Sequence, residues 1–123
     1  MATDQPLIHS EKILNGVLIT LMTQELLEEG VIASLEQSLL QTVNEAKETN
    51  FAINFEHVGF LSSAVLRALI KVNTAVNEKD GQLILCNINR SVLKVFKITR
   101  LDQVFDIQDD VESAVASFQS YRL

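Results

Sequence analysis

Apolar residues follow two different periods along the chain, and the first change of period lies in the N-terminal third. Val17–Leu21 is an apolar, β-branched run preceded by Asn15-Gly16, a dipeptide typical of tight hairpins. It predicts an antiparallel hairpin with the weaker apolar segment Leu7–His9. Apolar residues then recur at spacings of three and four, which predicts a helix of about four turns; its face is Ile32, Leu35, Leu39, Val43 and Ala46. Residues 22–31 fit either a first helical turn or a loop.

The middle of the chain repeats this change from strand to helix. Phe51–Phe55 alternates large and small residues, which predicts a strand. The helical period returns after it, with a face of Leu66, Leu69, Ile70 and Asn73. Asp80-Gly81 marks a turn, and Leu83–Ile88 is apolar without alternation, the pattern of a strand covered on both faces.

The last third predicts a short helix, an edge strand and a final helix. The short helix follows from Val92, Val95, Phe96 and Thr99, and the strand is Val104–Ile107. Asp109 and Glu112 form a capping box before a helix whose face is Val111, Ala114, Val115 and Phe118. The order ββαβαβαβα predicts an α/β fold: a mostly parallel mixed sheet with an antiparallel N-terminal strand and helices packed against it.

Composition and charge narrow the class of protein. The 123 residues are 47% apolar and show no change of composition, so we expect one domain over residues 1–123. The net charge, 10 − 16 = −6, argues against direct binding to nucleic acid or to an anionic lipid surface. No apolar run approaches the roughly 18–20 residues of a membrane span, and MATDQP does not resemble a signal peptide. We expect a cytoplasmic protein without membrane insertion.

Residues with catalytic chemistry are scarce, so we expect neither an enzyme, a metal site nor a cofactor. His57 could serve as a general base, but no partner is identifiable, and a solvated loop histidine is the favoured interpretation. The single Cys86 lies in an apolar strand, where cysteine acts as a small hydrophobic residue. The acidic residues Glu25, Glu28 and Glu29 lack the ligand pattern of a calcium loop, and the glycines form no phosphate-binding loop.

Two serines, Ser62 and Ser63, lie where the second long helix should begin. One of them is expected to cap the helix by accepting a hydrogen bond from a backbone amide. A helix N-terminus also favours anions, so the fold would tolerate a phosphate there. Such a phosphate adds about −1.5 to −2 charges and could weaken a partner interface through repulsion and desolvation.

The segments VGFLSSAVLRALI (Val58–Ile70) and Gly81–Ile107 resemble the STAS domain of bacterial anti-sigma factor antagonists. The resemblance places Ser62 at an Asp/Ser position, Ser63 at the phosphoacceptor and Ala64 at the next position, and Leu66-Arg67 matches a family variant. Ile98–Ile107 resembles the family's Thr-Gly-Leu turn followed by an acidic and an aromatic residue.

The sequence departs from the family pattern at three places. Val65 stands where a glycine is usual, beside the serines and on the side from which a partner would approach. Arg100 replaces the glycine of the Thr-Gly-Leu turn, and Thr20–Leu26 lacks an early Gly-x-Leu-Asp motif. The likeness in element order covers about residues 7–120.

The resemblance implies a phosphorylation-controlled partner switch without catalytic residues of its own. The unphosphorylated protein would bind an anti-sigma factor that is also a serine kinase, which frees the sigma factor for transcription. The kinase, holding ATP and Mg²⁺, would phosphorylate Ser63 and release the protein, and a phosphatase would reset it. Ser62, Ala64, Val65 and Arg67 would adjoin the switch or contact the partner, with Ser62 offering a hydrogen bond. For Arg67, the interpretation as a solvated helix residue is slightly favoured over a contact with the partner.

Other roles remain open at this stage. One is a STAS regulatory subunit of a transporter or lipid-trafficking ATPase complex, in which Ser63 only caps a helix. Another is a scaffold in a large stress-sensing assembly. The resemblance also leaves open whether the domain forms a dimer.

Overall fold

The central element of the computed structural model, which describes residues 6–118, is a five-stranded mixed sheet of order β1-β2-β4-β6-β7. These strands are β1 (Ile8–Ile13), β2 (Gly16–Leu21), β4 (Phe51–Asn54), β6 (Leu83–Cys86) and β7 (Asp106–Gln108). β1 pairs antiparallel with β2, and every other pairing in this sheet is parallel. The predicted α/β class is therefore confirmed.

The hairpin between β1 and β2 turns one residue earlier than the Asn-Gly dipeptide suggests. Its loop is Leu14–Asn15, and Asn15 takes the left-handed conformation with a φ of 68°. Gly16 already belongs to β2. A Cβ at Gly16 would lie 2.5 Å from the carbonyl oxygen of Asn50 and 2.8 Å from the Phe118 ring. The glycine is therefore needed for close packing and not for the turn.

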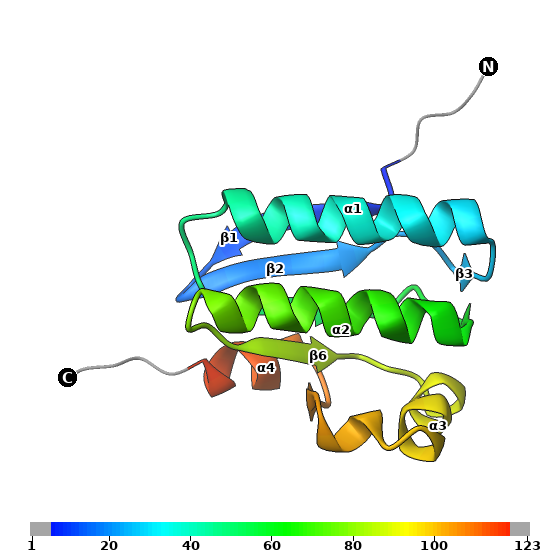
Figure 1. Ribbon diagram of the computed structural model, residues 1–123. Helices are drawn as coiled ribbons and strands as arrows, with labels where there is room; N and C mark the ends of the chain where they lie inside the picture. The colour runs from blue at the N-terminus through cyan, green and yellow to red at the C-terminus, as the bar shows by residue number, and fades with distance from the viewer. Residues whose placement is uncertain (1–5, 119–123) are drawn as a thin grey trace.

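The described part of the chain contains four helices that pack against the strands: α1 (Glu29–Glu45), α2 (Ser63–Glu78), α3 (Arg90–Ile98) and α4 (Val111–Ser117). The long helices α1 and α2 lie side by side over one face (Figure 1). Ile19, Ile53 and Leu85 are in register on β2, β4 and β6 and belong to the larger apolar cluster, to which α1, α2 and α3 contribute. α4 packs on the other face, where Ala114 and Phe118 meet Leu18, Ala52, Ile84 and Cys86. Coverage of both faces explains why β4 and β6 are buried at every position.

The predicted core faces are correct for α1 and partly wrong for α2. In α1, Ile32, Leu35, Leu39 and Val43 are buried, whereas Ala46 is the C-cap. In α2, Leu66 and Leu69 are buried, but Ile70 is 40% exposed and Asn73 is half-buried. Val72 and Val76 are buried instead, because α2 packs against both α1 and the sheet and so buries a wide stripe.

Two boundaries near the C-terminus are shifted from the prediction. The N-cap of α4 is Asp110, whose carboxylate accepts a hydrogen bond from the Ser113 amide at 2.8 Å, so the capping box at Asp109 is wrong by one residue. The edge strand β7 begins at Asp106, because a single 3-10 turn, η1 (Leu101–Gln103), ends at Val104. The short helix α3 buries Val92 and Phe96 as expected.

A second, two-stranded parallel sheet was not predicted. It joins β3 (Glu25–Leu26) to β5 (Phe60–Leu61), with Leu26 opposite Leu61. The side chain of Leu26 is completely buried, and its carbonyl accepts a hydrogen bond from the Ser62 amide at 3.0 Å. This small sheet therefore fixes the point at which α2 begins.

Candidate functional site

Ser62 and Ser63 lie at the start of α2. Ser62 has the extended backbone of an N-cap (φ −93°, ψ 167°), and its carbonyl accepts a hydrogen bond from the Val65 amide at 3.1 Å. Its hydroxyl makes no capping hydrogen bond. Ser63 is the first helical residue and is exposed. The prediction that a serine side chain caps α2 is therefore wrong, although Ser62 does occupy the cap position.

The backbone at the N-terminus of α2 favours an anion. The first amides of a helix have no acceptor within the helix, and they carry the positive end of its dipole. The first turn of α2 contains no acidic residue to compensate this charge. α1 begins at the same end of the molecule, and its N-cap Glu28 likewise makes no side-chain capping bond (Figure 1). The chemistry at Ser63 therefore suits an added anion.

The other predicted site residues differ in accessibility. Ala64 is half-buried, and Arg67 is exposed one turn into α2. Arg67 forms no ion pair with any other residue in the range 6–118. Val65 has no exposed surface and packs in the core. Its extra bulk is therefore directed inward, and the expectation that Val65 faces an approaching partner is corrected.

A surface groove of about 430 Å³ adjoins the serines. It lies between the small β3–β5 sheet and α3 and is called the β5–α3 groove; its lining is Glu25, Leu27, Gly59, Phe60, Leu61, Ser91, Val92 and Val95. Phe60 is 55% exposed, and Leu27 is 52% exposed. This groove was not predicted, because three segments distant in sequence build it.

Asn89 fixes one wall of the groove to the other. Its Oδ1 accepts a hydrogen bond from the Val92 amide at 2.8 Å, which caps α3. Its Nδ2 donates to the carbonyl oxygens of Val58 and Gly59, at 3.1 and 3.3 Å. One side chain thus holds the start of α3 against the loop that leads into β5 and Ser62.

The remaining candidates for chemistry do not join this site. His57 is exposed in the loop after β4. Cys86 is buried, and burial, together with the carboxylates of Asp110 and Glu56, raises the pKa of its thiol to about 11. That thiol stays neutral and unreactive at ordinary pH. Within residues 6–118, no three His, Cys, Asp or Glu side chains are grouped as metal ligands. No helix in that range is long and apolar enough to cross a membrane.

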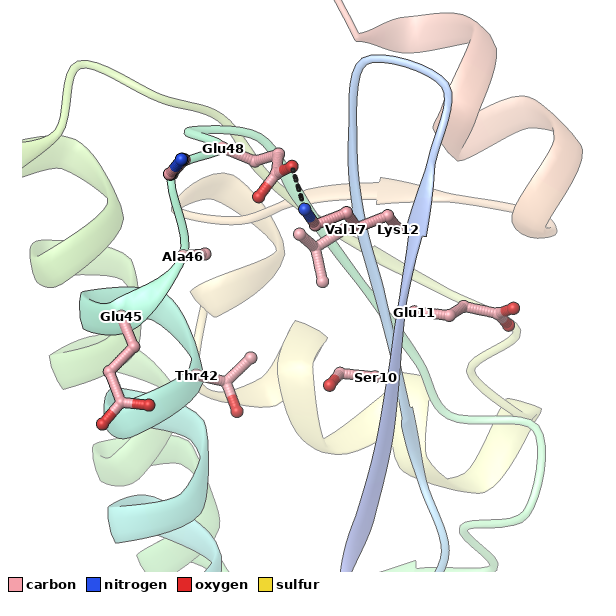
Figure 2. Close-up of a pocket in the computed structure, with 9 residues that line it drawn as sticks. Ser10, Glu11, Lys12, Val17, Thr42, Glu45, Ala46 and Glu48 are labelled. Atoms are coloured by element: carbon pink, nitrogen blue, oxygen red, sulfur yellow. Dashed lines mark ion pairs between the residues drawn. The ribbon is translucent and has the colours of Figure 1, made fainter.

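A second hollow, of about 480 Å³, lies between β1 and the C-terminal end of α1 (Figure 2). Lys12 Nζ reaches toward it and pairs with Glu48 Oε2 at 3.7 Å, while Thr42 lines the α1 side. The other Glu48 oxygen is buried without a hydrogen-bond partner. None of the predicted site residues lies here, since α2 begins at the opposite end of the molecule (Figure 1).

Comparison with known proteins adds two kinds of similarity. A family model described as the STAS domain matches residues 11–114. The protein BtrV of Bordetella bronchiseptica, provisionally named an anti-sigma factor antagonist, is 26% identical over 107 residues, which cover 87% of this chain and 90% of BtrV.

Two solved structures show the same fold at low identity. An anti-sigma factor antagonist from Mycobacterium paratuberculosis superposes with a TM-score of 0.80 and 17% identity, covering 92% of this chain and 93% of its own. SpoIIAA, a cell fate determinant of Bacillus solved in its phosphorylated form, has a TM-score of 0.64 and 20% identity, covering 86% of this chain and 95% of its own.

Proposed function

The chain belongs to the STAS domain family, and we propose that it is an anti-sigma factor antagonist whose protein partner is held or released by phosphorylation of Ser63. The observation that carries this proposal is the state of Ser63: it is exposed at the first position of α2, and the backbone around it is held by β3 through Leu26. A kinase could reach its hydroxyl without unfolding the helix.

The N-terminus of α2 would accept a phosphate at little cost to the fold. Free amides and the helix dipole stabilise an anion at this position. No carboxylate in the first turn of α2 opposes it. Phosphorylation would therefore change the surface and leave the core, including the buried Val65, as it is.

The same phosphate would disrupt a partner bound beside it. It adds about −1.5 to −2 charges, together with a hydration shell that a close interface would have to remove. The exposed Phe60 is three residues away along the chain, so apolar contact surface and switch adjoin. This arrangement supports binding in the unphosphorylated state and release in the phosphorylated state.

The partner of such a switch is an anti-sigma factor that is also a serine kinase and supplies ATP and Mg²⁺ itself, with a phosphatase that resets Ser63. The name of BtrV supports an anti-sigma factor as partner, and the phosphorylated form of SpoIIAA supports control by phosphorylation. In it the chain acts by binding and not by catalysis. Ser62 offers a hydrogen bond at the start of α2, and Arg67 is available to the partner one turn further on.

The test is a capture experiment from native lysate with four baits: wild type, Ser63→Ala, Ser63→Glu and Ser34→Glu. Ser34 is exposed on α1, so its variant adds the same charge at another place. We expect wild type, Ser63→Ala and Ser34→Glu to retain a kinase-type ATPase that Ser63→Glu loses. The purified kinase should then phosphorylate wild type but not Ser63→Ala, as measured by mass spectrometry.

Two results would contradict the proposal. Equal retention of a transporter ATPase by all four baits would indicate that the chain is a transporter subunit. Ser63 would then have no switching role. Phosphorylation confined to another residue would move the switch away from Ser63.

A further inference from the structure

The helix α3 has a charge opposite to that of the whole chain. Arg90, Lys94, Lys97 and Arg100 are four of the ten basic residues, and no acidic residue occurs from Arg90 to Leu101, although the net charge is −6. All four are exposed, and none forms an ion pair within the described part of the chain. Their charges are therefore available to a partner.

The face of α3 that borders the β5–α3 groove is mainly apolar, with Val92 and Val95 beside Ser91, and its apolar part continues beyond the groove. Ser91 and Val95 are four residues apart, so they share one helical face along the groove. Ile98 follows Val95 by three residues on the next turn and is 77% exposed. Lys94, three residues after Ser91, borders this apolar row on its solvent side.

The opposite wall of the groove is acidic. Glu25 lines it beside Leu27, and Glu28 and Glu29 follow at the start of α1. None of these three carboxylates forms an ion pair within residues 6–118. The lining of the groove is thus mainly apolar, with Glu25 on the β3 side, and the exposed cations of α3 lie outside this lining, at the end of the molecule where α2 begins (Figure 1).

On the premise of the proposed function, we propose that this groove docks a segment of the anti-sigma kinase that inserts apolar side chains beside Phe60 and directs carboxylates toward α3. Charge complementarity with Lys94 and the other exposed cations of α3, which border the groove, selects the segment, and Glu25 in the lining opposes the reversed orientation. Phe60 is the aromatic anchor, the residue type that dominates interface energetics.

With a segment docked in this groove, phosphorylation of Ser63 would act directly on the interface. The groove leads along Phe60–Leu61 directly into Ser62 and Ser63. A phosphate on Ser63 has the same sign as the carboxylates of the docked segment and competes with them for the cations of α3. Release then follows from direct repulsion at the groove and needs no change of fold.

The test measures the dissociation constant between the kinase captured by wild type and a set of purified variants, by isothermal titration calorimetry. We expect Phe60→Ala to raise the Kd at least about 10-fold. Lys94→Glu should raise it about 10-fold and make binding less sensitive to salt, because an attractive charge pair becomes repulsive. Both side chains are exposed, and thermal unfolding of each variant checks that the fold is kept.

Matched controls lie at the other end of the molecule. Leu14→Ala removes an apolar side chain that is more exposed than Phe60 from the hairpin loop, and Lys47→Glu reverses an exposed charge after α1. We expect both controls to bind within about twofold of wild type, since neither site touches the groove.

The outcomes separate this inference from the proposed function. If Ser63→Glu abolishes binding while Phe60→Ala and Lys94→Glu bind as wild type, the switch stands and the groove is wrong. If the groove variants lose binding and Ser63→Glu does not, docking stands and the switch is wrong. A wild type that retains no kinase from the lysate contradicts both.

Discussion

The two ends of the parallel strands in this protein differ in how completely their polar groups are used. At one end, called the closed end, the loops 14–16, 46–50 and 79–82 meet. At the other, called the switch end, residues 23–28, residues 60–63 and α3 meet. The closed end is tied by side-chain hydrogen bonds between distant segments. The switch end leaves two helix N-termini without side-chain caps.

Two side chains tie the closed end. Lys79 Nζ donates to the carbonyl oxygens of Val43 and Ala46, each at 2.7 Å, and lies 5.2 Å from the centre of the Phe51 ring. Asn50 donates to the carbonyl of Asn15 and accepts from the amide of Gln82, both at 3.1 Å. This contrast indicates which end stabilises the fold and which end can bind. Polar groups engaged at the closed end maintain the fold, and polar groups left free at the switch end can contact a partner.

The largest effect should come from adding one methyl group at each end. A Cβ at Gly81 would overlap the carbonyl oxygen of Thr49, a backbone atom that cannot rotate away. We expect Gly81→Ala to lower the free energy of unfolding by about 3 kcal/mol, measured by urea denaturation. At the switch end, Gly30 lies in the first turn of α1 with no atom within 4 Å of the added group.

Gly30→Ala should therefore raise the free energy of unfolding by about 0.5–1 kcal/mol, because alanine is the better helix former. The opposite signs of the two changes are the test of the comparison. Equal destabilisation by both would mean that the two ends are packed alike.

The second effect concerns the cation at the closed end. Lys79→Met keeps much of the apolar stem but leaves the carbonyls of Val43 and Ala46 without their donor, so we expect a loss of about 2 kcal/mol. Lys71→Met is the matched control: Lys71 is exposed and pairs with Glu36 at 3.2 Å on the helix surface. Its loss should be below about 0.5 kcal/mol in the same urea titration. A similar loss of stability for both variants would show that the hydrogen bonds of Lys79 do not stabilise the closed end.

The two turns of the closed end were predictable from sequence, but the glycines in them have a different role from the one inferred. Asn15-Gly16 and Asp80-Gly81 were both recognised as turns. In each pair the polar residue takes the left-handed conformation, with φ values of 68° and 59°, and the glycine allows close approach to the Thr49–Asn50 segment. A dipeptide pattern indicates a turn, whereas the neighbour that requires the glycine belongs to another part of the chain.

The switch end was predictable only at Ser62 and Ser63, which a strand-to-helix change and a family resemblance both indicate. β3 and β5 were missed because a two-residue strand is too short to show any period, and their pairing joins segments about 35 residues apart. The free hydroxyl of Ser62 depends on a side-chain rotamer that no sequence pattern specifies. The run of cations from Arg90 to Arg100 was visible in the sequence and indicates a charged surface beside the groove, but it does not indicate the groove itself.

A third, smaller effect compares two helix caps at the switch end itself. Asn89→Ala removes the cap of α3 and two further bonds to Val58 and Gly59, so we expect a loss of about 1.5 kcal/mol. Ser62→Ala should cost less than about 0.5 kcal/mol, because its hydroxyl caps nothing. Chemical denaturation of the two variants side by side measures the difference. A cost of about 1 kcal/mol for Ser62→Ala would show that its hydroxyl does cap α2 in solution.

The smallest expected change in stability tests whether the backbone is strained at the switch end. Arg100 follows the C-cap of α3 with a φ of 63°, the left-handed conformation in which helices usually place glycine. A residue with a Cβ in this conformation costs about 1–2 kcal/mol, which glycine would relieve. Part of that relief is lost, because glycine has more conformational entropy in the unfolded chain. We expect Arg100→Gly to raise the free energy of unfolding by about 0.5–1 kcal/mol. Arg100→Ala removes the same charge but keeps the Cβ, so it should not stabilise the protein. If both variants stabilise the protein equally, the change relieves repulsion among the cations of α3 and not backbone strain. The unpaired charges that keep the switch end available to a partner would then themselves lower the stability of the fold.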